Sequence, residues 1–312
     1  MHRVYASLPL SGPAARLGRD LLRGMQLALE RAYADVELVT LDSFGEDREE
    51  QAAANARQAV EDAAAVAYVG DFHSSQVLET APILGEAGLL TVAPVATFAD
   101  LRGPTLVRLM PHDGVGARAI AAWLTRVGAG ELLIVHDHDA DYGVAVGAMC
   151  DEAARKRGLT VRTRPVWNHD EPWAEDVGEA DAVLYVGVAG SGAIGLWRDL
   201  HGHDPGMWLL GSEGVAEEWL AQGIDASAAE RTRFFVAQRA PFALYGYEAM
   251  ALVLDAIAAE GGDRAAVTRA ARGTKDRDSI LGRYSIDDEG HTTTTAYGRL
   301  AVVDGVLVWD EP

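Results

Sequence analysis

The chain has 312 residues, of which 49% are hydrophobic, and its 47 acidic and 27 basic residues give a formal net charge of −20 at pH 7. A chain of this length exceeds one comfortable hydrophobic core, so two domains are expected. The acidic surface repels polyanions, which excludes nucleic acid as an expected partner. No apolar run reaches the ~20 residues of a membrane-spanning helix, so direct membrane insertion is not expected either.

Strand-like and helix-like patterns alternate along the first third of the chain. Short apolar, β-branched runs predict strands, and leucines at helical spacing predict the helices between them. The expected order is strand 3–9, helix 14–33, strand 36–42, helix 47–63, strand 65–72, helix 75–87 and strand 89–94. This βαβα order predicts a parallel sheet with helices on both faces.

The same pattern restarts after a strand expected at 105–111. The further elements are helix 113–127, strand 132–137, helix 143–157, strands 159–167 and 182–188, helix 192–202, strand 207–211, helix 215–222, strand 234–238, helices 243–261 and 263–272, and short strands between 280 and 309. No flexible linker separates the two α/β units. The fold class is therefore α/β, with two Rossmann-like lobes joined by several short crossings.

In an open parallel sheet, ligands bind beyond the carboxyl ends of the strands. In the segments that follow the expected strands, the candidate binding groups are hydroxyls, backbone groups and one carboxylate, that of Glu213. These segments are 11–13, 71–75 and 94–97 in the first unit, and 136–142, 187–191 and 212–214 in the second. Such a set suits a zwitterion, which needs donors at one end and an acid at the other.

Four residues carry this interpretation. Ser74 begins an expected helix, whose free N–H groups and dipole favour an anion such as a carboxylate. Thr97 offers a hydroxyl beside it, the Val95 carbonyl can accept from an ammonium group, and Glu213 supplies the opposing negative charge. Each residue alone also has an ordinary explanation, as a helix cap, a turn residue or a solvated loop acid. Their joint placement at strand ends favours a binding site.

Four segments of the sequence resemble motifs of one family, the branched-chain amino-acid binding proteins, which are type I periplasmic binding proteins of ABC importers. The segments are LPLSGPAARLGRDLLRGMQLALE, YVGDFHSSQVLETAPILGEAGLLTVAPVAT, IVHDHDADYGVAV and LLGSEGVAEEWL. They occur in the family's order, and the resemblance runs from about residue 3 to residue 309.

The resemblance implies a role for each matching residue. Ser74 would hold the ligand carboxylate, Thr97 would touch both carboxylate and ammonium, and the Val95 carbonyl would accept from the ammonium. Tyr142 would close over the ligand from the second lobe, and Glu213 would pair with the ammonium. The expected lobes are residues 1–111 plus about 243–285, and 112–242 plus about 286–312.

The resemblance further implies a solute-binding protein with the type I periplasmic binding protein fold, with neither catalysis nor a cofactor. It would capture a small amino acid or a related zwitterion between two closing lobes and deliver it to the membrane permease of an ABC importer. A monomer in the periplasm or outside the cell is expected. No signal peptide is visible, so a cytoplasmic location stays open.

The side-chain end of the pocket departs from the family pattern. It is expected to involve Leu17, Phe72, His73 and Val188, with Tyr245 as a further candidate. Leu17 stands where relatives often carry an aromatic ring, and Val188 stands where a tyrosine is expected. Both departures remove ring surface and leave the identity of the amino acid open. His73 is equally compatible with reading a polar ligand group and with ordinary packing.

Two alternatives stay open at this point. Gly190, Gly192 and Gly195 form a G-x-G-x-x-G sequence between an expected strand and helix, and Glu213 follows at about the spacing of a ribose-binding acid. A dinucleotide-binding enzyme is therefore the sharpest rival. A ligand-sensing receptor domain of the same fold is equally compatible with the motifs. The acidic and histidine residues between 136 and 141 do not resemble a closed zinc motif, so no metal is expected.

Overall fold

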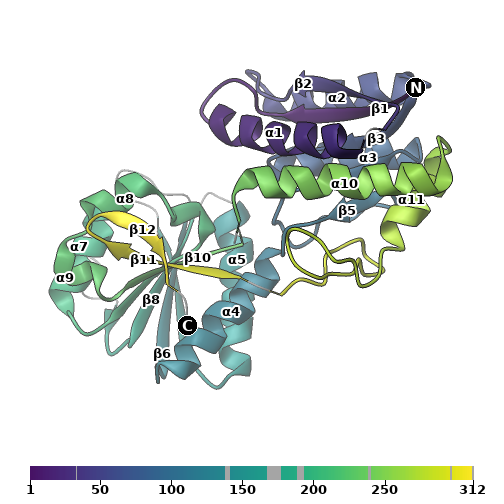
Figure 1. Cartoon of the computed structure of the whole chain (residues 1–312). Coiled ribbons are helices and arrows are strands. Elements are labelled where there is room, and N and C mark those ends of the chain that lie inside the picture. Colours follow the sequence, from purple (N-terminus) through teal and green to yellow (C-terminus); the bar gives the residue numbers. More distant parts are fainter. Residues whose placement is uncertain are drawn as a thin grey trace. The chain divides into compact units, whose positions relative to one another are not determined.

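The computed structural model describes residues 1–32, 34–137, 141–166, 177–187, 193–237, 240–295 and 297–310 (Figure 1). The chain divides into two compact units. Unit 1 comprises Met1–His112 and Ala240–Thr295, and unit 2 comprises Asp113–Arg239 and Ala296–Pro312. The chain therefore passes from one unit to the other three times, as the expected multiple crossings require.

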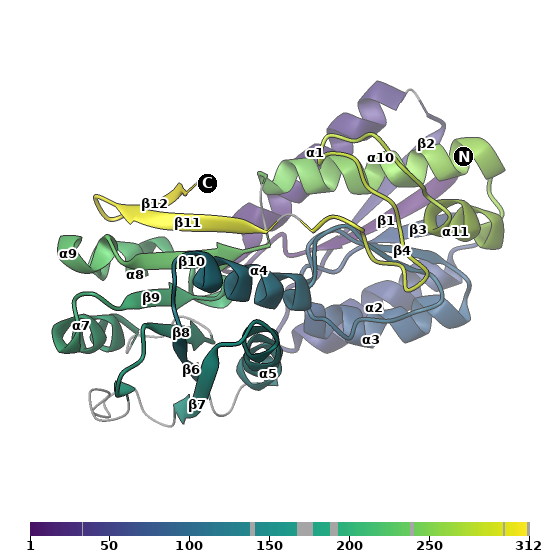
Figure 2. The same ribbon diagram turned by 90° about the horizontal axis from the view of Figure 1, so that it is seen from below.

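Unit 1 is built on a parallel sheet with the strand order β2-β1-β3-β4-β5. Its strands are β1 (His2–Leu8), β2 (Val36–Asp42), β3 (Ala65–Val69), β4 (Leu90–Ala93) and β5 (Leu106–Arg108). Its helices are α1 (Ala15–Ala32), α2 (Arg48–Glu61), α3 (Ser74–Glu86), α10 (Phe242–Glu260) and α11 (Arg264–Arg272). Helices α2 and α3 cover one face of the sheet, and α1, α10 and α11 cover the other (Figure 2).

Helices α1 and α10 lie side by side in both ribbon views (Figures 1 and 2). Two glycines allow their backbones to approach this closely. A Cβ on Gly24 would collide with the carbonyl oxygen of Ala243, and one on Gly246 would collide with that of Leu21. Among the described residues, α10 is the one helix that is long and apolar enough to cross a membrane, yet more than half of it is buried inside the protein. Its apolar character is that of a core helix.

Unit 2 repeats the winding of unit 1 and adds an antiparallel hairpin. Its strand order is β12-β11-β10-β9-β8-β6-β7. The strands are β6 (Glu131–Asp137), β7 (Thr160–Val166), β8 (Ala182–Val186), β9 (Trp208–Gly211), β10 (Thr232–Val236), β11 (Gly298–Val303) and β12 (Val306–Trp309). The helices are α4 (Asp113–Arg126), α5 (Asp141–Lys156), α7 (Ala193–His203), η1 (Glu213–Val215), α8 (Glu218–Gly223) and α9 (Ala226–Ala229).

The central strands of unit 2 are buried on both faces, as a parallel sheet covered by helices requires. Leu132 and Ile134 of β6 face the core beneath α4 and α5, whereas Leu133 and Val135 face the core beneath α7, α8 and α9. Successive side chains of a strand point to opposite faces, so one continuous apolar run serves two cores. This burial on both faces explains why these strands appear in the sequence as continuous apolar runs.

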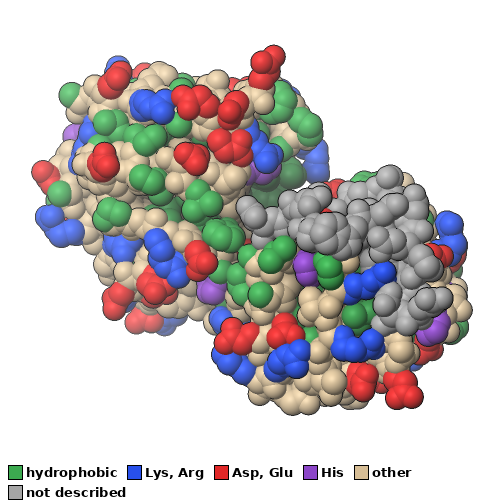
Figure 3. All heavy atoms as spheres, turned by 180° about the vertical axis from the view of Figure 1, so that it is seen from behind, with side chains coloured by type: hydrophobic (Ala, Val, Ile, Leu, Met, Phe, Trp, Pro, Cys, Tyr) green, Lys and Arg blue, Asp and Glu red, His purple; other side chains and the backbone are tan. Residues whose placement is uncertain are grey.

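On the part of the surface that Figure 3 shows and the structure describes, acidic and basic side chains are interspersed in both units. Apolar side chains lie scattered between them. On this face, the acidic side chains are therefore not confined to one unit.

The carboxyl-terminal part of the chain differs from the expectation. Residues 280–295 form turns and isolated bridges, and strands begin only at Gly298. The expected return to the second lobe near residue 286 was also placed too early, because unit 1 extends to Thr295. The reason is a backbone link to β5: the Thr292 N–H donates to the carbonyl of Arg108 at 2.9 Å, and the Arg108 N–H donates to the carbonyl of Gly290 at 2.8 Å. These bonds hold the segment on unit 1.

Candidate functional site

Each sheet has one point at which the strand order reverses. The chain continues from β1 to β2 on one side and then to β3 on the other, and β6 is followed by β7 and β8 in the same way. Crevices at the carboxyl ends of strands near such reversals are where open α/β sheets bind ligands. The predicted site residues of unit 1 follow β3 and β4, and those of unit 2 follow β6 and β9.

In unit 1, helix α3 begins at Ser74, directly after the loop that leaves β3. His73 is the N-cap residue, and its backbone N–H is bound by the side-chain oxygen of Gln76 at 3.4 Å. Ser74 is therefore not the cap, which was its ordinary explanation. A helix N-terminus presents aligned N–H groups to an anion, and Ser74 adds a hydroxyl at that place.

Two neighbouring serines have different partners. The Ser75 hydroxyl donates to Glu49 Oε1 at 2.7 Å and so ties α3 to α2. The Ser74 Oγ instead accepts the backbone N–H of Phe98 at 3.2 Å. This bond brings the start of α3 together with the loop after β4, where Val95 and Thr97 lie. The structure thus joins the three predicted residues of unit 1 in one region.

The loop after β4 supplies the other polar groups of unit 1. Val95 is 7% exposed, and Thr97 is half-buried. In the part of the chain that the structure describes, the Thr97 hydroxyl makes no hydrogen bond within the protein. A half-buried hydroxyl of this kind is open to a ligand.

Aromatic rings lie next to the polar groups at the start of α3. The Phe72 ring lies 5.0 Å from the ring of His73 and 5.7 Å from that of Phe242 at the start of α10. Burial and the positive charge of Arg48 lower the pKa of His73, so its imidazole is neutral at pH 7. Leu17, in the first turn of α1, is half-buried, whereas Tyr245 is 5% exposed and lies in the core.

Phe242 was missed from the sequence. Its signal was present, because an aromatic residue stands at the start of the apolar helix that follows β10. Tyr245, one turn further along, was named as the pocket candidate instead.

Unit 2 presents a carboxylate. Glu213 directly follows Ser212 beyond β9 and begins the short helix η1. It is half-buried, and its Oε2 accepts the backbone N–H of Ala237 at 3.3 Å. No cation pairs with it among the described residues. Burial raises the pKa of Glu213 to about 7, although the Ala237 bond opposes this rise. A carboxylate held in this state is stabilised by any cation that reaches it.

Tyr142 lies beside this acid, in the first turn of α5. Burial, and then the negative charges of Asp113 and Glu213, raise the pKa of the Tyr142 hydroxyl, which therefore keeps its proton. The Gly214 backbone approaches the Tyr142 ring, and a Cβ on Gly214 would collide with the carbonyl oxygen of Gly187. The loop after β9 therefore needs glycine at this position. The structure places Tyr142 close to Glu213, and the contacts of both residues with a ligand stay predictions.

Asp113 is a second acid near Tyr142 that sequence reasoning did not single out. It opens helix α4 and is 2% exposed. Its position at a helix start was visible in the sequence, but helix starts favour acids for structural reasons alone. Unit 2 thus gathers negative charge around Tyr142, whereas unit 1 gathers neutral donors around Ser74.

Several candidates lie outside the described residues. These are Val188, the glycines Gly190 and Gly192 of the dinucleotide motif, and His138 and Asp139 of the possible metal cluster. Gly195 lies inside α7. His136 and Asp137 end β6, and Asp137 Oδ1 accepts the hydroxyl of Tyr185 at 2.6 Å. No group of three or more potential metal ligands gathers within the described part of the chain.

A buried acid also lies beneath the site of unit 1. The Asp71 carboxylate is completely buried and accepts hydroxyl groups from Ser7 at 2.6 Å, Thr80 at 2.9 Å and Tyr68 at 3.1 Å. Burial raises its pKa to about 6, although the hydroxyl donors oppose this rise. Asp71 therefore has its hydrogen-bonding needs met inside the protein.

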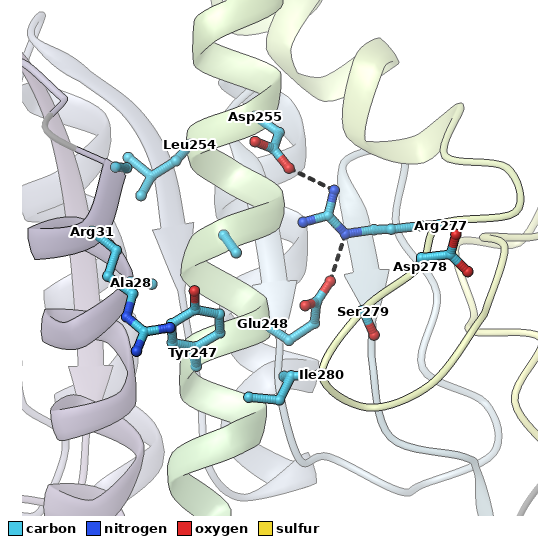
Figure 4. A pocket seen from close by; sticks show the side chains of 12 residues that line it. Ala28, Arg31, Tyr247, Glu248, Leu254, Asp255, Arg277, Asp278, Ser279 and Ile280 are labelled. Atoms are coloured by element: carbon cyan, nitrogen blue, oxygen red, sulfur yellow. Dashed lines mark hydrogen bonds and ion pairs between the residues drawn. The ribbon is translucent and has the colours of Figure 1, made fainter.

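A cavity of about 600 Å³ in unit 1 lies away from these groups, between α1, α10 and the segment 277–280 (Figure 4). Arg277 reaches across it and binds Glu248 at 2.5 Å and Asp255 at 2.6 Å. The Tyr284 hydroxyl donates to the same Glu248 at 2.7 Å. The charged groups that Figure 4 joins by dashed lines already hold one another, so they tie the segment to α10.

Residues 6–229 match the family described as periplasmic binding protein. The chain belongs to this family. The match covers most of both parallel sheets and includes Ser74, Val95, Thr97, Tyr142 and Glu213.

Individual relatives are distant but cover the whole chain. The Leu/Ile/Val-binding protein BraC3 of Rhizobium johnstonii is 24% identical and covers 96% of this chain and 91% of the relative. The leucine-binding protein LivK of Thermotoga maritima has a TM-score of 0.80 at 20% identity, covering 100% of this chain and 98% of that one. An ABC transporter substrate-binding protein of Desulfitobacterium hafniense in complex with Leu has a TM-score of 0.80 at 20% identity, covering 99% of each chain. The predicted fold, that of type I periplasmic binding proteins, is confirmed, and the named relatives are solute-binding proteins.

Proposed function

We propose that this protein binds a free branched-chain α-amino acid and delivers it to the membrane permease of an ABC importer. Unit 1 would hold the carboxylate through Ser74, Thr97 and the N-terminus of α3. Unit 2 would hold the ammonium through Glu213, with Tyr142 covering the ligand. No covalent step is involved.

The observation that carries the proposal is the state of Glu213. It is half-buried, has one hydrogen bond of 3.3 Å and no cationic partner among the described residues, and its pKa is about 7. A carboxylate that is removed from water costs free energy unless it is paired. An ammonium group from a ligand supplies that pair, and it forms the charge-assisted hydrogen bonds that a neutral ligand lacks.

Three observations support the choice of an aliphatic side chain. The rings of Phe72 and Phe242 and the half-buried Leu17 place apolar surface in unit 1 near the start of α3 or α1. His73 is neutral at pH 7 and so supplies no charge for an acidic side chain. The relatives that are named for their ligands bind leucine, isoleucine or valine. We therefore expect leucine, isoleucine and valine to bind before polar or charged amino acids.

A ligand that binds more tightly to the closed conformation than to the open one raises the population of the closed conformation. The permease would recognise this ligand-bound, closed form of the protein. The family relationship supports a periplasmic or extracellular place of action, where such a protein meets its solute. Catalysis is not part of the proposal.

A thermal-shift screen tests it. The twenty amino acids, leucinamide and NAD are each added in large excess, and hits are measured by titration calorimetry. A ligand at about 100 times its Kd stabilises the folded state by about 2.7 kcal/mol, which raises Tm by roughly 4 °C in a protein of this size. We expect this shift with leucine, isoleucine or valine. A shift with NAD and none with any amino acid would instead favour a dinucleotide-binding enzyme.

A further inference from the structure

The backbone of Phe98 is held on both sides by side chains. Its N–H donates to Ser74 Oγ at 3.2 Å, and its carbonyl oxygen accepts Nη1 of Arg108 at 2.5 Å. Two hydrogen bonds to the backbone of Phe98 therefore connect Arg108 with Ser74. A hydroxyl oxygen that accepts one N–H keeps its own proton for a different partner. The bond from Phe98 thus leaves the Ser74 proton available to a ligand carboxylate.

The sheet explains how Arg108 comes to lie there. It is the last residue of β5 and pairs with Ala93, the last residue of β4. The loop that contains Val95, Thr97 and Phe98 begins directly after Ala93. A side chain at the end of β5 is consequently within reach of the backbone of this loop.

Arg108 is completely buried, which is rare for a guanidinium group. Its main chain is fixed as well, because its N–H donates to Gly290 and its carbonyl accepts Thr292. Withdrawing a guanidinium from water costs free energy that its hydrogen bonds must offset. A rigid, buried donor of this kind defines the position of the carbonyl that it binds.

We propose that Arg108 is a positioning residue for recognition of the ligand carboxylate, acting through the Phe98 peptide on Ser74 and Thr97. This inference rests on the proposed amino-acid binding. Arg108 itself does not touch the ligand. It fixes the loop after β4, and that loop fixes the direction in which Ser74 and Thr97 present their hydroxyls.

The same loop offers a matched control. Arg102 donates to the carbonyls of Ala99 at 2.7 Å and Leu101 at 2.9 Å. Its side chain is 47% exposed and pairs with Glu289 at 3.2 Å. Both arginines therefore bind carbonyls of one loop, but only Arg108 binds the residue that donates to Ser74. Loss of either arginine perturbs the loop, and loss of Arg108 also releases Phe98.

The experiment compares the whole protein with its variants R108Q, R108K and R102Q. Titration calorimetry gives the Kd for L-leucine and for L-leucinamide, which keeps the ammonium group and side chain but lacks the carboxylate. We expect R108Q to weaken leucine binding by about tenfold, since a charge-assisted bond is lost, and to weaken leucinamide binding much less. R108K should fall between R108Q and the parent, because lysine restores a charged donor without the planar fork. R102Q should keep the parent's preference for leucine over leucinamide.

A general loosening of unit 1 would weaken both ligands alike, so the ratio of the two Kd values separates positioning from stability. If R108Q does not fold, R108K carries the same test. Equal preference for leucine over leucinamide in R108K, R102Q and the parent would overturn the inference.

Hydrogen exchange separates this inference from the proposed function. The Phe98 amide of the ligand-free protein should exchange faster in R108Q and R108K than in R102Q. If the parent binds no amino acid, the proposed function fails, and this exchange measurement alone decides whether Arg108 fixes the loop. If the Phe98 amide exchanges as slowly in both Arg108 variants as in the parent, the inference that Arg108 fixes the loop is refuted.

Discussion

The two units wind their parallel strands in the same relative order but place different chemistry at the strand ends. In unit 1, the segments after β3 and β4 supply hydroxyls, a helix N-terminus and aromatic rings. In unit 2, the segments after β6 and β9 supply Tyr142 and Glu213, with Asp113 nearby. The fold that the two units share therefore places the ligand-binding groups at the carboxyl ends of the strands. The few residues in the loops that follow these strands determine which charge is recognised there.

A buried or half-buried acid in each unit sharpens this contrast. Asp71 of unit 1 and Glu213 of unit 2 both have a raised pKa, and burial is the first cause in each. Asp71 receives three hydroxyl donors, whereas Glu213 receives one backbone N–H at 3.3 Å. We infer that a buried acid with several hydrogen-bond donors inside the protein stabilises the fold, whereas an acid with few donors is available to bind a ligand.

The largest effect is expected at Glu213. Replacement by glutamine in E213Q keeps the shape but removes the negative charge, so a bound ammonium would lose its partner. We expect leucine binding to weaken by about 2–5 kcal/mol, as measured by titration calorimetry. The exposed acid Glu218 provides the control, and E218Q should bind like the parent. Parental affinity in E213Q would show that the two acids do not differ in the way proposed.

The pH dependence of binding follows from the same residue. Below its pKa of about 7, Glu213 of the ligand-free protein is protonated, and an ammonium ligand must displace that proton. Affinity should therefore fall by up to about tenfold per pH unit below pH 7 and level off above it. Calorimetry in buffers of different ionisation enthalpy should detect the released proton at pH 6. E213Q should lack this dependence, and D71N should retain it.

The sequence predicted most of the fold because the α/β pattern is local. The helix expected at 243–261 is α10, Phe242–Glu260, and the helix expected at 113–127 is α4, Asp113–Arg126. The strands of the parallel sheets are apolar runs bounded by turn residues, which periodicity detects well. The segment 280–295 was misjudged because its contacts with β5 join residues that are distant in sequence.

The candidate site was predictable where a motif places a residue at a strand end. Ser74, Val95, Thr97, Tyr142 and Glu213 were all identified in this way, and their ligand contacts stay predictions. Phe242 and Arg108 could not be identified so. Phe242 meets Phe72 across an interval of 170 residues, and Arg108 reaches the loop only through the register of β5 with β4. Such placements are set by tertiary packing, which a local pattern does not contain.

Asp71 is expected to influence stability with the next largest effect. Its pKa is about 6 in the folded protein and near 3.9 in an unfolded chain. Between these values the folded state binds more protons, so stability should fall as pH rises from about 4 to about 6. The change amounts to about 3 kcal/mol. Urea unfolding followed by far-ultraviolet circular dichroism from pH 4 to pH 8 measures it, and D71N should lose this contribution.

Asp62 supplies a control of opposite sign in the same unit. The backbone N–H of Ala64, and to a lesser extent Arg3 and Tyr5, lower the pKa of Asp62 despite some burial. Its contribution to stability should therefore be lost as pH falls, and D62N should remove that loss. D71N and D62N should change the pH dependence of the free energy of unfolding in opposite directions. A change in the same direction would show that burial without a charged partner does not explain the raised pKa of Asp71.

The smallest effect compares two adjacent serines. Ser74 Oγ accepts the Phe98 N–H, and the Ser75 hydroxyl donates to Glu49. S74A should weaken leucine binding by about 1 kcal/mol, or roughly fivefold, because the N–H groups of α3 still face the carboxylate. S75A should leave the Kd unchanged and instead raise the pKa of Glu49, whose hydrogen bond from Ser75 is the main cause of its low value. Since both variants remove one hydroxyl from the same helical turn, an equal loss of affinity would mean that the start of α3 acts through its stability alone. A loss confined to S74A would instead assign the effect to the hydroxyl that Phe98 orients.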